Sequence, residues 1–204
     1  MRLYTVASNG MLCWYHYYQD KPDPNGWEAG SGDPLAQGGW DKYKQITAAD
    51  RGVIYAVTQD GNLLWHRYRT GEDPNKYPDG WVAGSGTVIG QGGWNGFKQI
   101  AAASNGVIYA VTPDGNLLRY RYTQDIPVAN GWADSGTVIE QGGWAAFKQI
   151  AAASNGVIYA VTPDGNLLWY HPVPDGWAPR SGSVVGQGGW NMFNHITVQF
   201  DRCP

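Results

Sequence analysis

Short runs of β-branched and aromatic residues, separated by polar turns, recur along the whole chain. Residues 107–112 read Val-Ile-Tyr-Ala-Val-Thr and residues 117–122 read Leu-Leu-Arg-Tyr-Arg-Tyr, a composition typical of β-strands. The pair Asp114 and Gly115 lies between them and favours a tight hairpin, because both residue types accept the backbone angles of such turns. No segment has an apolar period of 3.6 residues, so we expect almost no helix.

The same order of elements continues on both sides of this hairpin. Residues 94–103 predict a strand rich in small residues, which ends in a turn at 104–106. After residue 122 a polar loop with a proline leads to Trp132 and then to a fourth strand at 137–139. Four short antiparallel strands in a repeat of about 50 residues are typical of one blade of a β-propeller.

The tetrapeptide Gln-Gly-Gly-Trp marks a repeat. It occurs four times, and its tryptophans are 54, 50 and 46 residues apart. The residues left over at the two ends of the chain form a fourth unit of 54. A stretch of 22 residues is identical in the second and third units, which indicates recent duplication or an idealised design. We predict one domain, residues 1–204, with units 40–93, 94–143, 144–189, and 190–204 joined with 1–39.

The predicted fold class is therefore all-β: a four-bladed β-propeller of four-stranded antiparallel blades. The split unit suggests how the ring closes, since residues 190–196 repeat a first strand and residues 3–6 repeat a second. We expect the C-terminal strand to pair with the N-terminal strands, which leaves no open sheet edge. An open fragment that oligomerisation completes is the alternative.

Charge and composition exclude several classes of partner. The formal net charge is −3, whereas proteins that bind nucleic acid are usually basic. No apolar run approaches the ~20 residues that cross a bilayer, so we expect no membrane insertion. The N-terminus lacks the apolar region of a signal peptide, which favours a cytoplasmic or non-classically released protein and otherwise leaves localisation open. Cys13 and Cys203 fit no zinc spacing, and we predict no bridge between them.

The repeat motif points to a known family. Gly-Trp, a spacer, and then Val-Ile-Gly-Gln-Gly-Gly-Trp-x-x-Phe-Lys-x-Ile resembles the blade of the tachylectin-type β-propeller lectins, over the whole chain. The resemblance implies a non-catalytic protein without a cofactor that binds N-acetylated hexosamines, such as N-acetylglucosamine or N-acetylgalactosamine, in one pocket per blade between neighbouring blades. The best-known member has five blades. The family's Asp-Asn pair before the first tryptophan is here Asp-Gly or Asn-Gly.

Each unit contains residues that suit an uncharged sugar. Aromatic rings stack on the C–H faces of sugars, and a few polar groups fix the orientation. A tryptophan follows the Asp-Gly or Asn-Gly pair, and the later Gly-Gly pair leaves backbone groups bare. The competing interpretation is that the tryptophans fill gaps between blades and the glycines permit a bulge. The candidate ligand-binding residues are Asn25, Trp27, Asp79, Trp81, Asn130, Trp132, Asp175, Trp177, Gly39, Gly93, Gly143 and Gly189.

Nothing in the sequence favours an enzyme or a metal site. The aspartates of the hairpins are explained by turn chemistry, and acids repeated once per blade do not form the paired carboxylates of a glycosidase. The four histidines have no metal spacing, and we expect the basic residues at one position of the third strand, such as Arg67, to face solvent. The predicted function is a multivalent lectin for glycans that bear N-acetylhexosamine, as a monomer or weak oligomer. The alternative is a protein-interaction scaffold whose tryptophans are structural.

Overall fold

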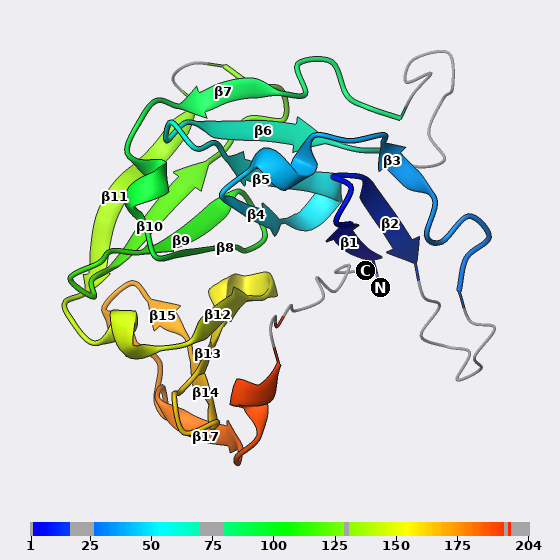
Figure 1. The fold of residues 1–204 in the computed structure, drawn as a ribbon. Coiled ribbons are helices and arrows are strands. Elements are labelled where there is room, and N and C mark those ends of the chain that lie inside the picture. The colour runs from blue at the N-terminus through cyan, green and yellow to red at the C-terminus, as the bar shows by residue number, and fades with distance from the viewer. Residues whose placement is uncertain (1, 17–26, 70–79, 129–130, 194–195, 197–204) are drawn as a thin grey trace.

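The strands form four antiparallel sheets that are the blades of a four-bladed β-propeller, and a small separate two-stranded sheet (Figure 1). The computed structural model describes residues 2–16, 27–69, 80–128, 131–193 and 196. Within these ranges the helical segments are 3-10 turns of three residues, so the prediction of an all-β protein is confirmed.

Three of the sheets have four strands and the sheet nearest the N-terminus has three, as far as the described residues go. Each four-stranded sheet follows chain order, from an innermost strand to an outermost one. The first two sheets are β1 (Arg2–Val6), β2 (Leu12–His16) and β3 (Pro34–Ala36); and β4 (Gln45–Ala48), β5 (Val53–Val57), β6 (Leu63–Arg67) and β7 (Thr87–Gly90). The other two are β8 (Gln99–Ala102), β9 (Val107–Val111), β10 (Leu117–Tyr122) and β11 (Trp132–Glu140); and β12 (Gln149–Ala152), β13 (Ile158–Val161), β14 (Leu167–Tyr170) and β17 (Ser183–Gly186). Between β14 and β17 the chain forms a separate hairpin of β15 (Pro172–Val173) and β16 (Gly176–Trp177).

The predicted Asp-Gly hairpins connect the second and third strands of these blades. In the β5–β6 turn the Thr58 amide donates to the Asn62 carbonyl, and Asn62 Nδ2 donates to Asp60 Oδ2 over 2.8 Å. The same side-chain bond recurs at Asp114 and Asp164. These aspartates therefore act in the turns, as local turn chemistry predicts.

The first strand of each unit begins later than predicted. Trp94 opens a 3-10 turn, Trp94–Gly96, and β8 starts only at Gln99. The cause is Gly93, whose φ of 82° reverses the chain just before the tryptophan. Residues 94–98 are thus a turn and a short connection, and the prediction of one strand over 94–103 is wrong for this part. The equivalent turns are Trp40–Lys42, Trp144–Ala146 and Trp190–Met192.

Side chains of one innermost strand bond the backbone of the next blade. Gln45 Nε2 donates to the Phe97 carbonyl over 2.9 Å, and Gln45 Oε1 accepts from the Ile100 amide over 2.9 Å. The Ala102 amide donates to Thr47 Oγ1 over 2.9 Å. Polar side chains on β4 thereby pair with backbone amides on the open edge of β8, which has no further strand of its own sheet beside it among the described residues.

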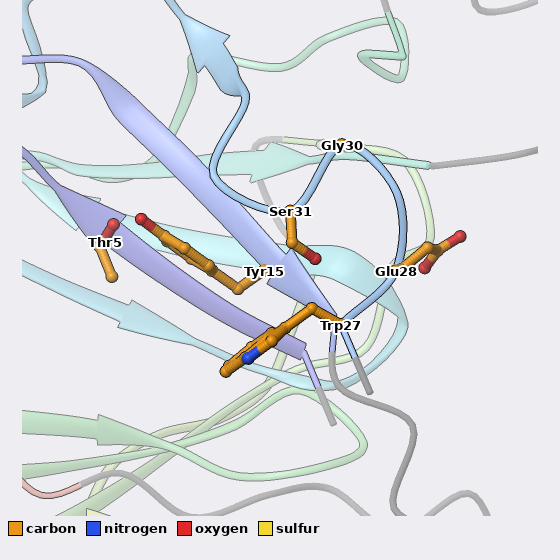
Figure 2. A pocket seen from close by; sticks show the side chains of 6 residues that line it. All are labelled: Thr5, Tyr15, Trp27, Glu28, Gly30 and Ser31. Carbon is orange, nitrogen blue, oxygen red and sulfur yellow. The ribbon is translucent and has the colours of Figure 1, made fainter. Parts of the chain in front are cut away.

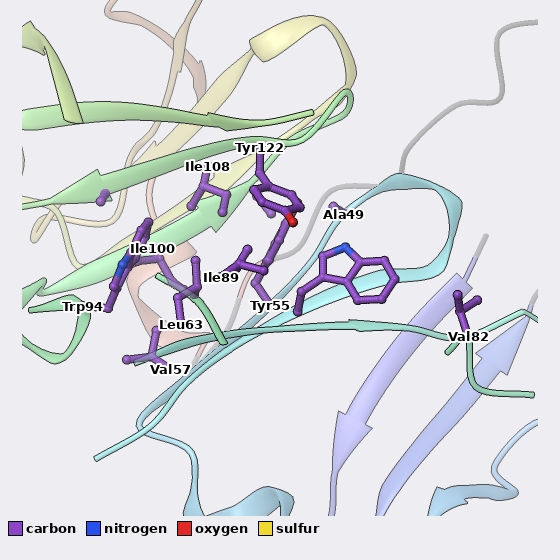
Figure 3. Close-up of a cluster of buried hydrophobic side chains, with 13 residues drawn as sticks. Ala49, Tyr55, Val57, Leu63, Val82, Ile89, Trp94, Ile100, Ile108 and Tyr122 are labelled. Atoms are coloured by element: carbon purple, nitrogen blue, oxygen red, sulfur yellow. The ribbon is translucent and has the colours of Figure 1, made fainter. Parts of the chain in front are cut away.

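The core lies between the blades rather than within one. Tyr55, Leu63 and Trp65 of the β4–β7 blade are almost fully buried against Trp94 and Ile108 of the β8–β11 blade (Figure 3). Alanines at 101–103 and 151–152 let the innermost strands approach one another. Each blade is consequently stabilised by burying apolar surface on its neighbours.

Two expectations lie outside the described residues. The strand proposed to close the ring belongs to residues 190–204, of which the structure describes only 190–193, with the turn Trp190–Met192, and Ile196. The cysteine prediction involves Cys203, which is also outside the described part, whereas Cys13 is buried in β2. Both stay predictions.

Candidate functional site

Three of the units contain the same group of four aromatic rings, here called the ring cluster. We call the tryptophan after the Asp-Gly or Asn-Gly pair the first tryptophan and that of Gly-Gly-Trp the second. The ring cluster consists of a second tryptophan, the aromatic residue three positions later, one ring of the third strand, and the first tryptophan that follows it along the chain. The two tryptophans are stacked, with centroids 5.8–5.9 Å apart and ring planes within 24° of parallel. The ring clusters are Trp40, Tyr43, His66, Trp81; Trp94, Phe97, Tyr120, Trp132; and Trp144, Phe147, Tyr170, Trp177.

The second tryptophans are structural in these clusters. Trp40, Trp94 and Trp144 are buried, with exposed fractions of 6%, 6% and 3%. Each belongs to an apolar cluster that joins two blades. A ring buried in this way contributes a large apolar area to the core and offers little surface to a ligand.

The first tryptophans of the same clusters link their blade to the preceding one. Trp81 Nε1 donates to the Leu35 carbonyl in β3 over 3.3 Å, and Trp132 Nε1 donates to the Ile89 carbonyl in β7 over 2.7 Å. In the β12–β17 blade the acceptor is a side chain instead: Trp177 Nε1 donates to Glu140 Oε2 over 2.6 Å. These three indoles, all half-buried, have a structural contact of their own.

Trp27, the first tryptophan of the split unit, is more exposed. Its exposed fraction is 42%, and it meets the Tyr15 ring edge to face at a centroid distance of 5.8 Å. It lines a pocket of about 590 Å³ together with Thr5, Tyr15, Glu28, Gly30 and Ser31 (Figure 2). A pocket of this size with an aromatic wall and a few polar groups suits a small ligand.

The pocket residues of β1 and β2 are more exposed than their counterparts in the β4–β7 blade. Thr5 in β1 is exposed, whereas Ala56 at the matching position in β5 has no exposed surface. Tyr15 in β2 is half-buried, whereas His66 at the matching position in β6 is 9% exposed. At the positions of Thr5 and Tyr15 the β4–β7 blade is therefore covered by packing.

A serine holds the loop that borders the pocket. The His16 amide donates to Ser31 Oγ over 3.1 Å, and the Gly32 amide donates to the Trp14 carbonyl over 2.7 Å. Arg67 with Ser85, and His171 with Ser181, make the same amide-to-hydroxyl bond. The loop is therefore anchored to the third strand, so the pocket wall is a defined surface.

Loop length differs in one unit, and the structure gives the reason. From Trp132 to the next Gly-Gly-Trp the spacer is one residue shorter than in the other units. There the chain continues as the nine-residue strand β11, whereas the longer spacers turn at Gly30, Gly84 or Arg180, all with positive φ. The extra residue thus converts a strand into the turn that borders the Trp27 pocket.

The other predicted site residues are only partly placed. Asn25, Asp79 and Asn130 lie outside the described residues. Asp175 is exposed in the turn between β15 and β16, just before Trp177. Gly39, Gly93, Gly143 and Gly189 all have φ near 80° and precede the 3-10 turns, and a Cβ on the first three would meet no neighbour within 4 Å.

The basic positions of the third strand do not all face solvent. Arg67 is 5% exposed, because its guanidinium Nε donates to the Arg51 carbonyl and its Nη1 approaches Asp125 Oδ1 of the next blade at 3.4 Å. The expectation of a solvated side chain is wrong here. His66 is also buried; burial lowers its pKa to about 4, and its Nε2 has no hydrogen-bond partner in the described structure.

Sequence reasoning missed Thr5, Tyr15, Glu28 and Ser31 as pocket residues. Glu28 Oε2 contacts His16 Nδ1, and the Glu28 amide donates to the His16 carbonyl over 2.7 Å. The signal available in the sequence was a difference between units, since Thr5 and Glu28 replace small or apolar residues of the other repeats. Among the described residues there is no group of side chains that could hold a metal ion, and no helix long and apolar enough to cross a membrane.

Comparisons with known proteins agree with this architecture. The family model described as Tachylectin matches residues 2–129 and 122–202. A solved structure described as "The de novo evolutionary emergence of a symmetrical protein is shaped by folding constraints" is similar with a TM-score of 0.61, 22% identity, and coverage of 95% of this chain and 77% of that one.

A second similar structure is that of SapL1 lectin in complex with alpha methyl fucoside. Its TM-score is 0.50 and its identity 20%, with coverage of 91% of this chain and 59% of that one. At such identities the likeness shows the propeller fold. A comparison with curated proteins gives no match.

Proposed function

The chain belongs to the Tachylectin family, and on that premise we propose that it is a carbohydrate-binding lectin that performs no catalysis. The observation that carries the proposal is the exposed indole of Trp27 in a pocket with Ser31, Thr5 and Glu28. An aromatic platform flanked by a few polar groups is the arrangement that binds the C–H face and the hydroxyls of a sugar. SapL1, a lectin of similar fold, is seen with a fucoside.

The proposed ligand class is N-acetylated hexosamines, following the resemblance of the repeat. In the Trp27 pocket a hexose ring would stack on the indole, and the Ser31 and Thr5 hydroxyls would hydrogen-bond its polar edge. The Asn25 position, two residues before Trp27, would supply a further polar group. Because these contacts involve neither paired acids nor a metal, binding without hydrolysis is the expected outcome.

We place further pockets at the equivalent tryptophans, which makes the protein multivalent. The candidate pairs are Asp79 with Trp81, Asn130 with Trp132, and Asp175 with Trp177, and the nearby glycines Gly39, Gly93, Gly143 and Gly189 would allow backbone contacts. Several weak sites on one rigid body bind a glycan-covered surface far more tightly than one site does.

Isothermal titration with N-acetylglucosamine and N-acetylgalactosamine tests the proposal. We expect millimolar to micromolar binding, and Trp27→Ala should weaken or remove one class of site. Ile126→Ala is the matched control, since Ile126 is an exposed apolar residue of another blade. A stoichiometry of one would retain the lectin and remove multivalency, whereas no binding of any sugar would favour the protein-interaction scaffold.

A further inference from the structure

Two acidic residues distinguish the Trp27 pocket from the same place in the other units. Glu28 lines the pocket, and Asp33 Oδ2 lies 3.0 Å from the point that a Cβ on the lining residue Gly30 would occupy. None of the six lining residues is a lysine or an arginine. The other units have uncharged residues at the position of Glu28 (Val82, Ala133, Ala178) and at that of Asp33 (Thr87, Thr137, Ser183).

The Glu28 carboxylate is held in place beside the pocket. Its Oε2 contacts His16 Nδ1, and both side chains are partly exposed, at 34% for Glu28 and 22% for His16. The backbone of Glu28 is fixed by the bond from its amide to the His16 carbonyl. Figure 2 shows the carboxyl group extending away from the Trp27 ring, so it would act on a charge in the pocket through space, an effect that extends over the Debye length of about 10 Å at 0.1 M salt.

A sugar that carries its own carboxylate would meet repulsion in this pocket. Like charges at short range disfavour one another, and low-dielectric walls strengthen the effect. A neutral sugar has no such penalty, and its hydroxyls can donate to a carboxylate oxygen. The positions that match Glu28 in the other units lack this charge.

We propose that the Trp27 pocket selects neutral sugars over acidic ones, with Glu28 as the residue that determines this selectivity. The inference rests on the proposed lectin function and adds the charge class of the ligand. It concerns this pocket alone, since Asp79 and Asp175 stand beside the tryptophans of two other proposed sites in the sequence and carry charges of their own.

A matched pair of probes tests the selectivity. The methyl glycoside of N-acetylglucosamine and its derivative oxidised at C6 to a carboxylate differ in that one group. We expect the Trp27 site, identified as the site that Trp27→Ala removes, to bind the neutral probe at least about tenfold more tightly at low salt, and Glu28→Gln to reduce the ratio at this site to about threefold or less. Asp114→Asn is the control: it removes the same charge from a hairpin tip of another blade and should leave the ratio unchanged.

The outcomes separate this inference from the proposed function. If neither probe binds, the lectin proposal fails first. If both probes bind and Glu28→Gln leaves their ratio unchanged, the inference is wrong and the lectin proposal stands. If Glu28→Gln unfolds, the salt dependence of the wild-type protein still tests the inference. An electrostatic preference for the neutral probe must shrink at high salt, so a ratio of the two affinities that stays constant from 20 mM to about 500 mM salt would overturn the inference.

Discussion

Trp81 and Trp27 occupy the same position of the repeat, and the structure gives them different surroundings. Trp81 stacks on Trp40, and its indole N–H bonds the Leu35 carbonyl of the preceding blade. Trp27 meets Tyr15 edge to face, 42% of its surface is exposed, and it lines the pocket. The same residue can therefore link two blades or form a wall for a ligand, depending on what lies over it.

The strand positions beside the two tryptophans differ in the same way. Ala56 in β5 has no exposed surface, whereas Thr5 at the matching position in β1 is exposed. Close packing buries the ring and stabilises the fold, and an uncovered ring leaves its apolar face for a sugar. Stability and binding should thus respond oppositely when the two tryptophans are removed.

The largest expected effect is on stability. Trp81→Ala removes a stacked, hydrogen-bonded indole and should lower the free energy of unfolding by about 2–4 kcal/mol. Trp27→Ala should lower it by about 1 kcal/mol or less, because 42% of its surface is already exposed in the folded protein, while it impairs sugar binding. Urea unfolding of both variants measures the contrast. Equal losses of stability would mean that Trp27 is also a core residue.

The second effect is a pH dependence that arises at His66. Three units have tyrosine at this third-strand position, and only this unit has histidine. Burial lowers the pKa of His66 from 6.5 to about 4, so the unfolded chain binds a proton that the folded protein does not. The contribution is fully present above pH 6.5 and is lost as pH falls toward 4, by about 3 kcal/mol in total.

Chemical denaturation at pH 7.5, 6 and 5 measures this dependence. His66→Tyr, which installs the residue of the other units, should remove most of the slope. Trp81 lies in the same ring cluster as His66, so the pH effect reports on this cluster and not on the Trp27 pocket. An identical slope in the wild-type protein and His66→Tyr would contradict the assignment to His66.

Local chemistry explains why the strands and hairpins could be predicted from the sequence. β-Branched runs and Asp-Gly pairs act within a few residues, and the turn at Asp60 forms through its own neighbours. The 3-10 turn at Trp94 was missed because it depends on the positive φ of Gly93, which a Gly-Gly pair permits but does not require. The error therefore concerns an element boundary and leaves the blade unchanged.

The exposure of the candidate site residues could not be predicted, because it depends on contacts between residues that are far apart in the sequence. Trp27 and Trp81 stand in nearly identical segments, Trp-x-Ala-Gly-Ser-Gly, and only the packing of other blades separates their roles. Arg67 was expected in solvent, yet Asp125 of the next blade lies against it. Such exposure is set by residues about 50 positions away, which a repeat pattern alone does not specify.

A third effect concerns the loop that borders the pocket. Ser85→Ala removes the hydroxyl that accepts from the Arg67 amide, so it should lower the free energy of unfolding by about 1 kcal/mol. Ser31→Ala should do the same in the first blade and also weaken sugar binding. Ser135→Ala is the control, because Ser135 lies within the continuous strand β11 and should change stability by less than about 0.5 kcal/mol. Denaturation midpoints of the three variants decide the comparison.

The smallest effect is a gain in stability at the same loop. Arg180 has a φ of 70°, where Gly30 and Gly84 stand in the matching loops with φ of 87° and 85°. A side chain in the left-handed region costs about 1–2 kcal/mol, and the greater freedom of glycine in the unfolded chain offsets about half of that. Arg180→Gly should therefore raise the free energy of unfolding by about 0.5–1 kcal/mol in urea denaturation. Arg180→Ala keeps the Cβ in this conformation and should bring no gain, so an equal gain in both variants would show that the long side chain, and not the backbone, is the source of the strain.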